Sequence, residues 1–171
     1  MVRALYLLRH AKSSWEDPAL PDRERPLAPR GRRDAKRMAK HLVRLGIEPE
    51  LVLCSPAVRT RETLDLVRPA LGAGTEVRLE EGLYAASSDE LLERIRVVPE
   101  TVASVMLIGH NPGMQRLAIV LASGGAELER LEAKFPTTAL ATLTFESATW
   151  SRLGPADAVL AGYVVRRKLR S

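Results

Sequence analysis

Three short apolar runs divide the first two thirds of the chain, and helical patterns separate them. The runs cover residues 4–8, 51–54 and 105–108. Apolar runs of this length, bounded by charged or turn-forming residues, are typical of buried strands. Because these strands alternate with helical segments, the pattern predicts an α/β domain with a mostly parallel sheet and helices on both faces.

Polar side chains that can bind a ligand or take part in catalysis follow each of these runs. Arg9 and His10 end the first run, Ser55 and Arg59 follow the second, and His110 follows the third. In open α/β sheets, ligands bind at the carboxyl ends of the strands. We therefore expect two histidines and two arginines to meet at one edge of the sheet.

The remaining elements are predicted from periodicity and capping residues. Ser55 and Pro56 have the types favoured at the start of a helix, and so do Asn111 and Pro112. Further helices are predicted over 29–45 and 87–97, and further strands over 77–79, 138–145 and 158–166.

Length and composition indicate one domain, residues 1–171, that folds without disulfide bonds. With 171 residues and 46% hydrophobic content, the chain can bury a sizeable core. Its one cysteine excludes an internal disulfide and is typical of a reducing compartment. No apolar run approaches the ~18 residues of a membrane span, and no secretory signal pattern is recognised. We expect a cytoplasmic protein with no membrane association.

The net charge of +5 raises the question of nucleic-acid binding. The arginines are spread along the chain, and aromatic residues make up only 4% of it, too few for stacking platforms. A scattered basic surface that favours acidic or phosphorylated partners is the better interpretation. We expect no nucleic-acid partner.

The predicted cluster suits the transfer of a phosphoryl group. A transferring phosphoryl group spreads negative charge over three oxygens, which cationic donors stabilise when they are already in place. Arg9 and Arg59 can each present a planar fork to these oxygens. A histidine such as His10 can attack phosphorus when one ring nitrogen is unprotonated and a hydrogen bond to the other fixes the tautomer. His110 can donate a further hydrogen bond.

The sequence lacks the residue spacings that other kinds of catalytic site require. Four residues separate Cys54 from Arg59, whereas thiolate phosphatases have five, and Pro56 removes a backbone N–H that the phosphate would need. Histidines and carboxylates do not fall at familiar metal-ligand spacings, and no Gly-x-Ser-x-Gly elbow is present. We expect no metal and no cofactor.

These motifs together resemble the histidine phosphatase superfamily, which includes the phosphoglycerate mutases, and within it the SixA-type phosphohistidine phosphatases. The resemblance spans residues 3 to about 165 and rests on Leu8-Arg9-His10-Ala11-Lys12-Ser13-Ser14-Trp15, Asp22-x-x-Arg25-Pro26-Leu27-x-x-x-Gly31, Ser55-Pro56-x-x-Arg59-Thr60-x-Glu62-Thr63 and Gly109-His110-Asn111-Pro112. It implies a three-layer α/β/α fold like that of phosphoglycerate mutase. By the same resemblance His10 is the nucleophile, Arg9, Arg59 and His110 form the phosphate pocket, and Ser13 is expected among the substrate-binding residues.

The proton donor for the leaving group is left open. In mutase-like relatives a glutamate three residues before a tyrosine has this role, and Glu81 with Tyr84 matches the spacing. Glu80 is the adjacent alternative, and either can instead be a solvated carboxylate. SixA-type members often lack a clear donor, and a phosphoramidate needs less acid help than an alkyl ester.

The interval between Tyr84 and His110 has room for one helix and one strand, and mutase-like relatives carry a large cap-forming insertion there. Without a cap, the cleft should be open and suited to a phosphorylated side chain on another protein. We therefore expect a metal-independent phosphatase that forms a phosphohistidine intermediate and acts on phosphohistidine of a partner protein. The alternatives are a broad phosphatase of small phosphate esters and a non-catalytic module that binds phosphorylated proteins. The oligomeric state is not predicted.

Overall fold

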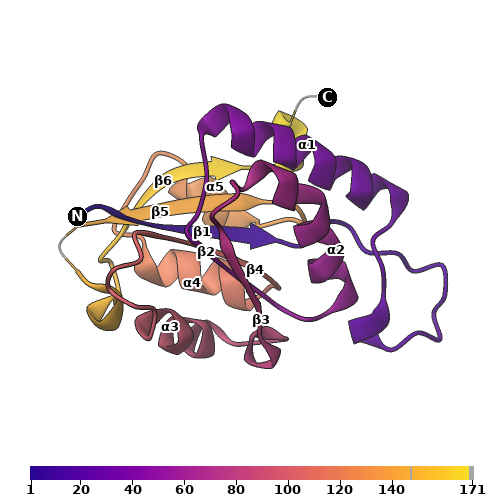
Figure 1. Cartoon of the computed structure of the whole chain (residues 1–171), viewed down its shortest axis with the longest axis horizontal. Helices are drawn as coiled ribbons and strands as arrows, with labels where there is room; N and C mark the ends of the chain where they lie inside the picture. Colours follow the sequence, from indigo (N-terminus) through magenta and orange to yellow (C-terminus); the bar gives the residue numbers. More distant parts are fainter. Residues whose placement is uncertain (147, 170–171) are drawn as a thin grey trace.

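The computed structural model describes residues 1–146 and 148–169, which form a central sheet with helices packed on both of its faces (Figure 1). The strands are β1 (Arg3–Arg9), β2 (Leu51–Cys54), β3 (Glu76–Leu79), β4 (Ser104–Gly109), β5 (Leu140–Phe145) and β6 (Val159–Val164). The α-helices are α1 (Pro29–Leu45), α2 (Val58–Val67), α3 (Ser88–Arg96), α4 (Gly113–Leu121) and α5 (Leu128–Ala133). Short 3₁₀ turns are η1 (Asp22–Glu24), η2 (Arg68–Ala70), η3 (Glu81–Leu83), η4 (Trp150–Arg152) and η5 (Arg166–Lys168).

The sheet has the strand order β3-β2-β4-β1-β5-β6. Neighbours from β3 to β1 pair in parallel, whereas β5 is antiparallel to both β1 and β6. Within the described ranges β5 alone therefore runs against the other strands, and the prediction of a mostly parallel three-layer α/β sheet is confirmed. The order places β2, β4 and β1 side by side, so the three strands with polar residues at their ends are neighbours.

Two apolar cores lie on the two faces of the sheet because successive strand residues point to opposite sides. Leu5 and Leu7 of β1 belong to the core under α3, α4 and α5, whereas Leu8 belongs to the core under α1 and α2. Figure 1 shows α1 and α2 on one side of the sheet, and α3 and α4 on the other.

Helix α1 lies directly against the chain that follows β1. A Cβ on Gly31 would lie 2.2 Å from the carbonyl oxygen of Lys12, so only glycine allows this approach. Helix α1 spans the predicted residues and ends at Gly46, whose φ of 66° is the left-handed C-cap that glycine tolerates best. The segment just after His10 is therefore packed beneath a rigid helix.

Two helices begin two residues and one residue after their predicted starts, and one helix is not among those predicted. Helix α2 begins at Val58, because the Ser55 hydroxyl contacts His110 at the sheet edge. Helix α4 begins at Gly113, and Oδ1 of Asn111 accepts from the Gln115 amide in its first turn. The capping box of α3 is confirmed: the Ser87 hydroxyl accepts from the Glu90 amide, and the Glu90 carboxylate accepts from the Ser87 amide. Helix α5 was not predicted, since it is only six residues long with one buried residue, Leu131.

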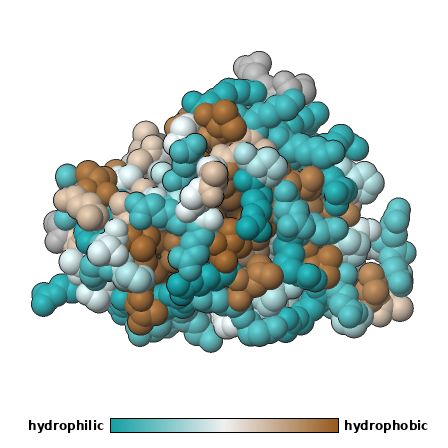
Figure 2. Space-filling model, viewed as in Figure 1, coloured by the Kyte–Doolittle hydropathy of each residue, from teal (hydrophilic) through white to brown (hydrophobic). Residues whose placement is uncertain are grey.

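The interval between Tyr84 and His110 contains α3 and β4 and no large insertion, as predicted. Hydrophilic residues cover most of the face in Figure 2 and separate its apolar patches. In residues 1–146 and 148–169, no helix has the length and apolar character that crossing a membrane would require.

Candidate active site

The ends of β1, β4 and β2 bring the predicted pocket residues together. The His10 amide donates to the carbonyl of Gly109, and the Ser55 amide donates to the carbonyl of Ile108, each over 3.1 Å. These backbone bonds extend the sheet by one residue beyond each strand. The rings of His10 and His110 then lie 5.4 Å apart between centroids.

His10 has the protonation state of a nucleophile. Its Nδ1 lies 2.7 Å from the carbonyl oxygen of Ala11, and because a carbonyl only accepts, Nδ1 carries the hydrogen. The lone pair is therefore on Nε2. Burial, the largest effect, and the charges of Arg59 and Arg9 together lower the pKa of His10 to about 3, against a raising effect of the hydrogen bond to Ala11. The ring is neutral at ordinary pH.

The backbone around His10 is held from both sides. The Ala11 amide donates to Oγ1 of Thr63 over 3.0 Å, and that hydroxyl donates to the carbonyl of Arg59 over 2.8 Å. On the other side, the Thr138 amide donates to the His10 carbonyl over 3.1 Å. His10 is thus tied both to the helix that carries Arg59 and to the segment before β5.

Arg59 lies in the first turn of α2 and is 7% exposed. Its Nη2 lies 3.4 Å from Nδ1 of His110, so this guanidinium and the two imidazoles form one cluster. Nη1 of Arg59 donates to the Asp22 carbonyl over 2.7 Å, and Nη2 donates to Oδ2 of Asp22 over 2.9 Å. The guanidinium is therefore held in a fixed orientation.

The neighbouring contacts also fix the tautomer of His110. A guanidinium only donates, so Nδ1 of His110 accepts from Arg59, and Nε2–H donates to Oγ of Ser55 over 2.8 Å. Burial, followed by the charge of Arg59, lowers the pKa of His110 to about 4. His110 is neutral here, and the ring nitrogen beside Arg59 is an acceptor rather than the expected donor.

Arg9 adds the second guanidinium. Its Nη1 donates to the carbonyl of Phe135 over 3.0 Å. Burial and then the charge of Arg59 lower the pKa of Arg9, which shows that the two cations share one region. Two guanidiniums beside two neutral imidazoles make an electropositive pocket suited to an anion.

Asp22 is a pocket residue to which the sequence analysis gave no role. Its carboxylate accepts from Arg59 and, over 2.6 Å, from the hydroxyl of Tyr84. The Tyr84 hydrogen bond, together with Arg59, lowers the pKa of Asp22 to about 2 against a smaller opposing effect of burial. The available signal was the motif Asp22-x-x-Arg25-Pro26-Leu27, which places this carboxylate in the charged loop after His10.

The geometry gives Glu81 contacts other than those expected of a proton donor. Its two carboxylate oxygens each lie 2.8 Å from Arg23, and 73% of its side chain is exposed. The hydrogen bond from Arg23 lowers the pKa of Glu81, which keeps the carboxylate ionised.

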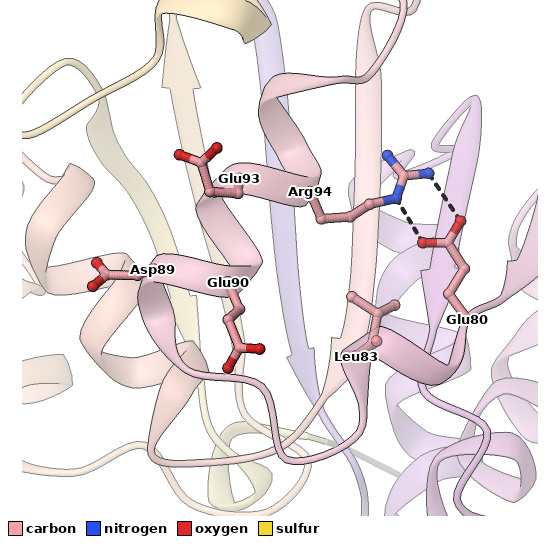
Figure 3. Close-up of a pocket in the computed structure, with 7 residues that line it drawn as sticks. Glu80, Leu83, Asp89, Glu90, Glu93 and Arg94 are labelled. Atoms are coloured by element: carbon pink, nitrogen blue, oxygen red, sulfur yellow. Dashed lines mark hydrogen bonds and ion pairs between the residues drawn. The ribbon is translucent and has the colours of Figure 1, made fainter.

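The alternative donor, Glu80, is also bound elsewhere. It pairs with Arg94 over 2.6 and 2.9 Å at a cavity between η3 and α3, as Figure 3 shows. The hydrogen bond from Arg94 lowers its pKa as well. Both glutamates therefore lack the raised pKa of a general acid.

Ser13 is buried and forms an isolated backbone bridge with Leu27. Within the described part of the chain, its hydroxyl has no hydrogen bond to the pocket histidines or arginines. Its expected contact with substrate is not shown by this geometry.

Cys54 is fully buried in β2, as its place in an apolar run predicted. Its Sγ donates to the carbonyl of Ser55 over 3.3 Å, and burial raises the pKa of the thiol to about 12. A thiol with this pKa is not a nucleophile at neutral pH. Across residues 1–146 and 148–169, no three or more His, Cys, Asp or Glu side chains are grouped as metal ligands would be.

The fold and this pocket define a phosphatase of the α/β class. Residues 5–91 match the model of the histidine phosphatase superfamily, branch 1, and the chain belongs to this family. An uncharacterised protein of Mycobacterium tuberculosis is 38% identical over 165 residues, which are 94% of this chain and 100% of the relative. Phosphohistidine phosphatase SixA of Escherichia coli is 27% identical over 146 residues, covering 84% of this chain and 86% of SixA.

Solved structures show the same architecture. A crystal structure from Agrobacterium tumefaciens, assigned as a phosphohistidine phosphatase SixA, superposes with a TM-score of 0.79 and 30% identity. The superposition covers 95% of this chain and 97% of that one. The similarity to SixA-type proteins that the motifs predict is confirmed over nearly the whole length of the chain.

Proposed function

We propose that this phosphatase hydrolyses phosphohistidine on a partner protein through a phosphohistidine intermediate at His10. One observation carries the proposal: the neutral Nε2 of His10 is unprotonated in a pocket that also holds Arg9 and Arg59. The likeness to SixA-type proteins supports the choice of substrate.

In the first step, Nε2 of His10 attacks the phosphorus of the substrate. A P–N bond to His10 forms while the P–N bond to the substrate imidazole breaks. The leaving imidazole keeps the electron pair of that bond and takes a proton from solvent. Arg9 and Arg59 bind the equatorial oxygens, on which negative charge is concentrated in the transition state.

In the second step, water attacks the phosphorus of phosphorylated His10. The new O–P bond forms as the P–Nε2 bond breaks, and the water proton passes to solvent. Inorganic phosphate leaves and Nε2 recovers its lone pair. Throughout, Nδ1–H remains bonded to the Ala11 carbonyl, which also stabilises the positive charge that the ring acquires when it is phosphorylated.

The protonation states of the carboxylates near the pocket favour a phosphoramidate substrate over an alkyl phosphate ester. The nearby carboxylates Asp22, Glu80 and Glu81 all have lowered pKa values and are ionised at neutral pH. An alkoxide leaving group needs an acid, an advantage of about 10²–10⁴ in rate, whereas an imidazole nitrogen departs readily. The absence of a large insertion between Tyr84 and His110 also leaves room for a side chain presented by another protein.

A substrate panel on the wild type and His10→Ala tests this function. The panel contains a phosphohistidine protein, p-nitrophenyl phosphate and sugar phosphates, each measured with and without exhaustive chelation by EDTA. We expect preference for phosphohistidine, activity that survives chelation, and loss of all turnover in His10→Ala. Rapid quench with labelled substrate should trap an acid-labile, base-stable label on His10.

Other outcomes separate the alternatives. Higher kcat/KM on small esters would identify a small-molecule phosphatase, and binding without turnover would identify a non-catalytic module. A label on a serine or on Cys54 would overturn the mechanism.

A further inference from the structure

A strongly basic cavity of about 400 Å³ lies outside the pocket described above. Its apolar lining comes from Pro136, Tyr163 and Val165. Basic side chains from α1, α5, η5 and the segment before β5 surround that lining: Arg30, Arg130, Lys134, Arg166, Arg167 and Lys168.

The carboxylates around this cavity neutralise only part of its charge. Asp34 pairs with Arg166 over 2.8 Å and with Arg30 over 3.7 Å. Glu127 pairs with Arg130 over 3.2 Å and with Lys168 over 3.5 Å. Six cations thus face two carboxylates.

Two of the cations are available for a ligand. Among the residues that the structure describes, no carboxylate lies within ion-pair distance of Lys134 or Arg167. Both side chains are exposed. The cavity therefore has a local excess of positive charge that an anionic partner can neutralise.

One wall of the cavity is the segment that positions the catalytic pocket. Pro136 and Thr137 line the cavity. On either side of them, the Phe135 carbonyl accepts from Arg9, and the Thr138 amide donates to the carbonyl of His10. Since consecutive Cα atoms are ~3.8 Å apart, a peptide segment of a few residues can extend from the cavity to the phosphoryl group in the His10 pocket.

We propose that this basic cavity binds acidic side chains that flank the phosphohistidine of the partner protein, an inference that rests on the proposed function. Glutamate or aspartate carboxylates of the partner pair with Lys134 and Arg167 while the phosphoryl group enters the His10 pocket. The cavity thereby selects phosphoproteins with an acidic neighbourhood and increases their rate of encounter by electrostatic steering.

The lining of the cavity disfavours nucleic acid as its occupant. Binding of single strands relies on exposed aromatic faces on which bases stack. Tyr163 is 7% exposed, its ring is stacked on Phe135 with centroids 6.0 Å apart, and its hydroxyl donates to the Lys134 carbonyl. The ring is thus part of the core and has little free surface on which a base can stack.

The test compares two phosphohistidine peptides that differ only in having three glutamates or three glutamines beside the phosphohistidine. Each is measured with the wild type, with the double variant Lys134→Glu/Arg167→Glu, and with the matched control Lys40→Glu/Arg44→Glu. Lys40 and Arg44 are exposed residues in the C-terminal part of α1, so the control removes the same charges at a distance of ~15 Å or more from Arg30 along the helix.

For the wild type and the control we expect kcat/KM on the acidic peptide to exceed that on the neutral peptide by roughly tenfold at low salt. In Lys134→Glu/Arg167→Glu the ratio should fall to about one or reverse. The wild-type ratio should shrink at ~0.5 M salt, where screening shortens the reach of surface charges. No preference in the wild type, or an equal loss in the control, overturns the proposal.

A binding arm keeps the inference independent of catalysis. Fluorescence anisotropy measures how tightly the unphosphorylated acidic peptide binds the same three proteins. If phosphohistidine is never hydrolysed, the proposed function is wrong. Even then, weaker binding of the acidic peptide by Lys134→Glu/Arg167→Glu would support the cavity as a binding site for acidic side chains. If the binding of pyrophosphate or ATP depends on Lys134 and Arg167 and the acidic peptide does not bind, the cavity binds small phosphates and the proposal is wrong.

Discussion

Oδ2 of Asp22 lies 2.9 Å from Nη2 of Arg59, and the Asp22 carbonyl lies 2.7 Å from Nη1 of the same guanidinium. A carboxylate of the protein is thus bound to the arginine that we expect to bind the phosphoryl oxygens. An incoming phosphate must share Arg59 with this carboxylate or displace it.

Asp22→Asn should therefore strengthen anion binding. Removing a negative charge close to the phosphate site, while keeping an oxygen that accepts from Tyr84 and Arg59, lowers the inhibition constant of inorganic phosphate by roughly 3–10-fold. Asp17→Asn is the control, because Asp17 is an exposed residue of the same loop. Weaker inhibition in Asp22→Asn would show that the carboxylate orients Arg59 more than it competes with the ligand.

Arg59→Ala should reduce kcat/KM by roughly 10²–10³, the usual cost of removing one positioned donor to a developing charge. Arg61→Ala provides a close comparison, because this residue is two positions farther along α2, is exposed, and donates to the carbonyl of Pro56. Steady-state kinetics on one substrate measure both variants. Similar losses would indicate a diffuse basic surface instead of a positioned clamp.

Binding of a phosphate analogue should be accompanied by proton uptake at His110. In the structure Nδ1 of His110 accepts from Arg59, and this nitrogen can donate to a phosphate oxygen only after it is protonated. A bound anion raises the pKa of a nearby imidazole from its value of about 4. Calorimetric titration with tungstate in buffers of different ionisation enthalpy measures the uptake, which His110→Gln should abolish if this residue is its source.

The two buried histidines should make the fold less stable in mild acid. The unfolded chain protonates both rings below pH about 6.5, whereas the folded chain resists until about pH 4 for His110 and about pH 3 for His10. The unfolded state therefore binds more protons in this window. The stability contributed by the neutral rings is fully present above pH about 6.5 and is lost as the pH falls toward these folded values.

Each ring adds at most roughly 1.4 kcal/mol per pH unit to this slope. Urea unfolding between pH 7 and 4.5 measures it, and the double variant His10→Gln/His110→Gln should show a shallower decline. An unchanged slope would place the cause in other groups.

Glu81→Gln should change kcat/KM by less than about threefold on both phosphohistidine and alkyl phosphates. Glu81 is an exposed partner of Arg23, and such surface pairs contribute little. Parallel assays on the two substrates provide the measurement. A selective loss on alkyl phosphates would restore Glu81 as the acid for that leaving group.

The convergence of His10, His110 and Arg59 was predictable because the two histidines directly follow strands and Arg59 lies in the first turn of the helix after a third strand. Apolar runs identify the strands, and the parallel sheet places their carboxyl ends at one edge. The contacts of Asp22 were not predictable in this way. They depend on the path of the loop before α1, which is set by distant partners, such as Glu62 accepting from the Leu27 amide over 2.8 Å.

The helix starts illustrate the same limit. Ser55 has the local character of an N-cap, and that local preference predicted a helix from Pro56. In the folded chain its hydroxyl accepts from His110, a residue 55 positions away, and α2 begins at Val58. A tertiary contact at the site outweighed a local capping preference that is typically worth about 1 kcal/mol.

Cys54 gives the protein a built-in reporter of conformational opening. It is the one cysteine of the sequence, and its side chain is fully inaccessible in the folded state. A thiol reagent can modify it only in molecules whose β2 region has opened. The rate of labelling therefore measures how often this part of the sheet comes apart, and no added probe is needed.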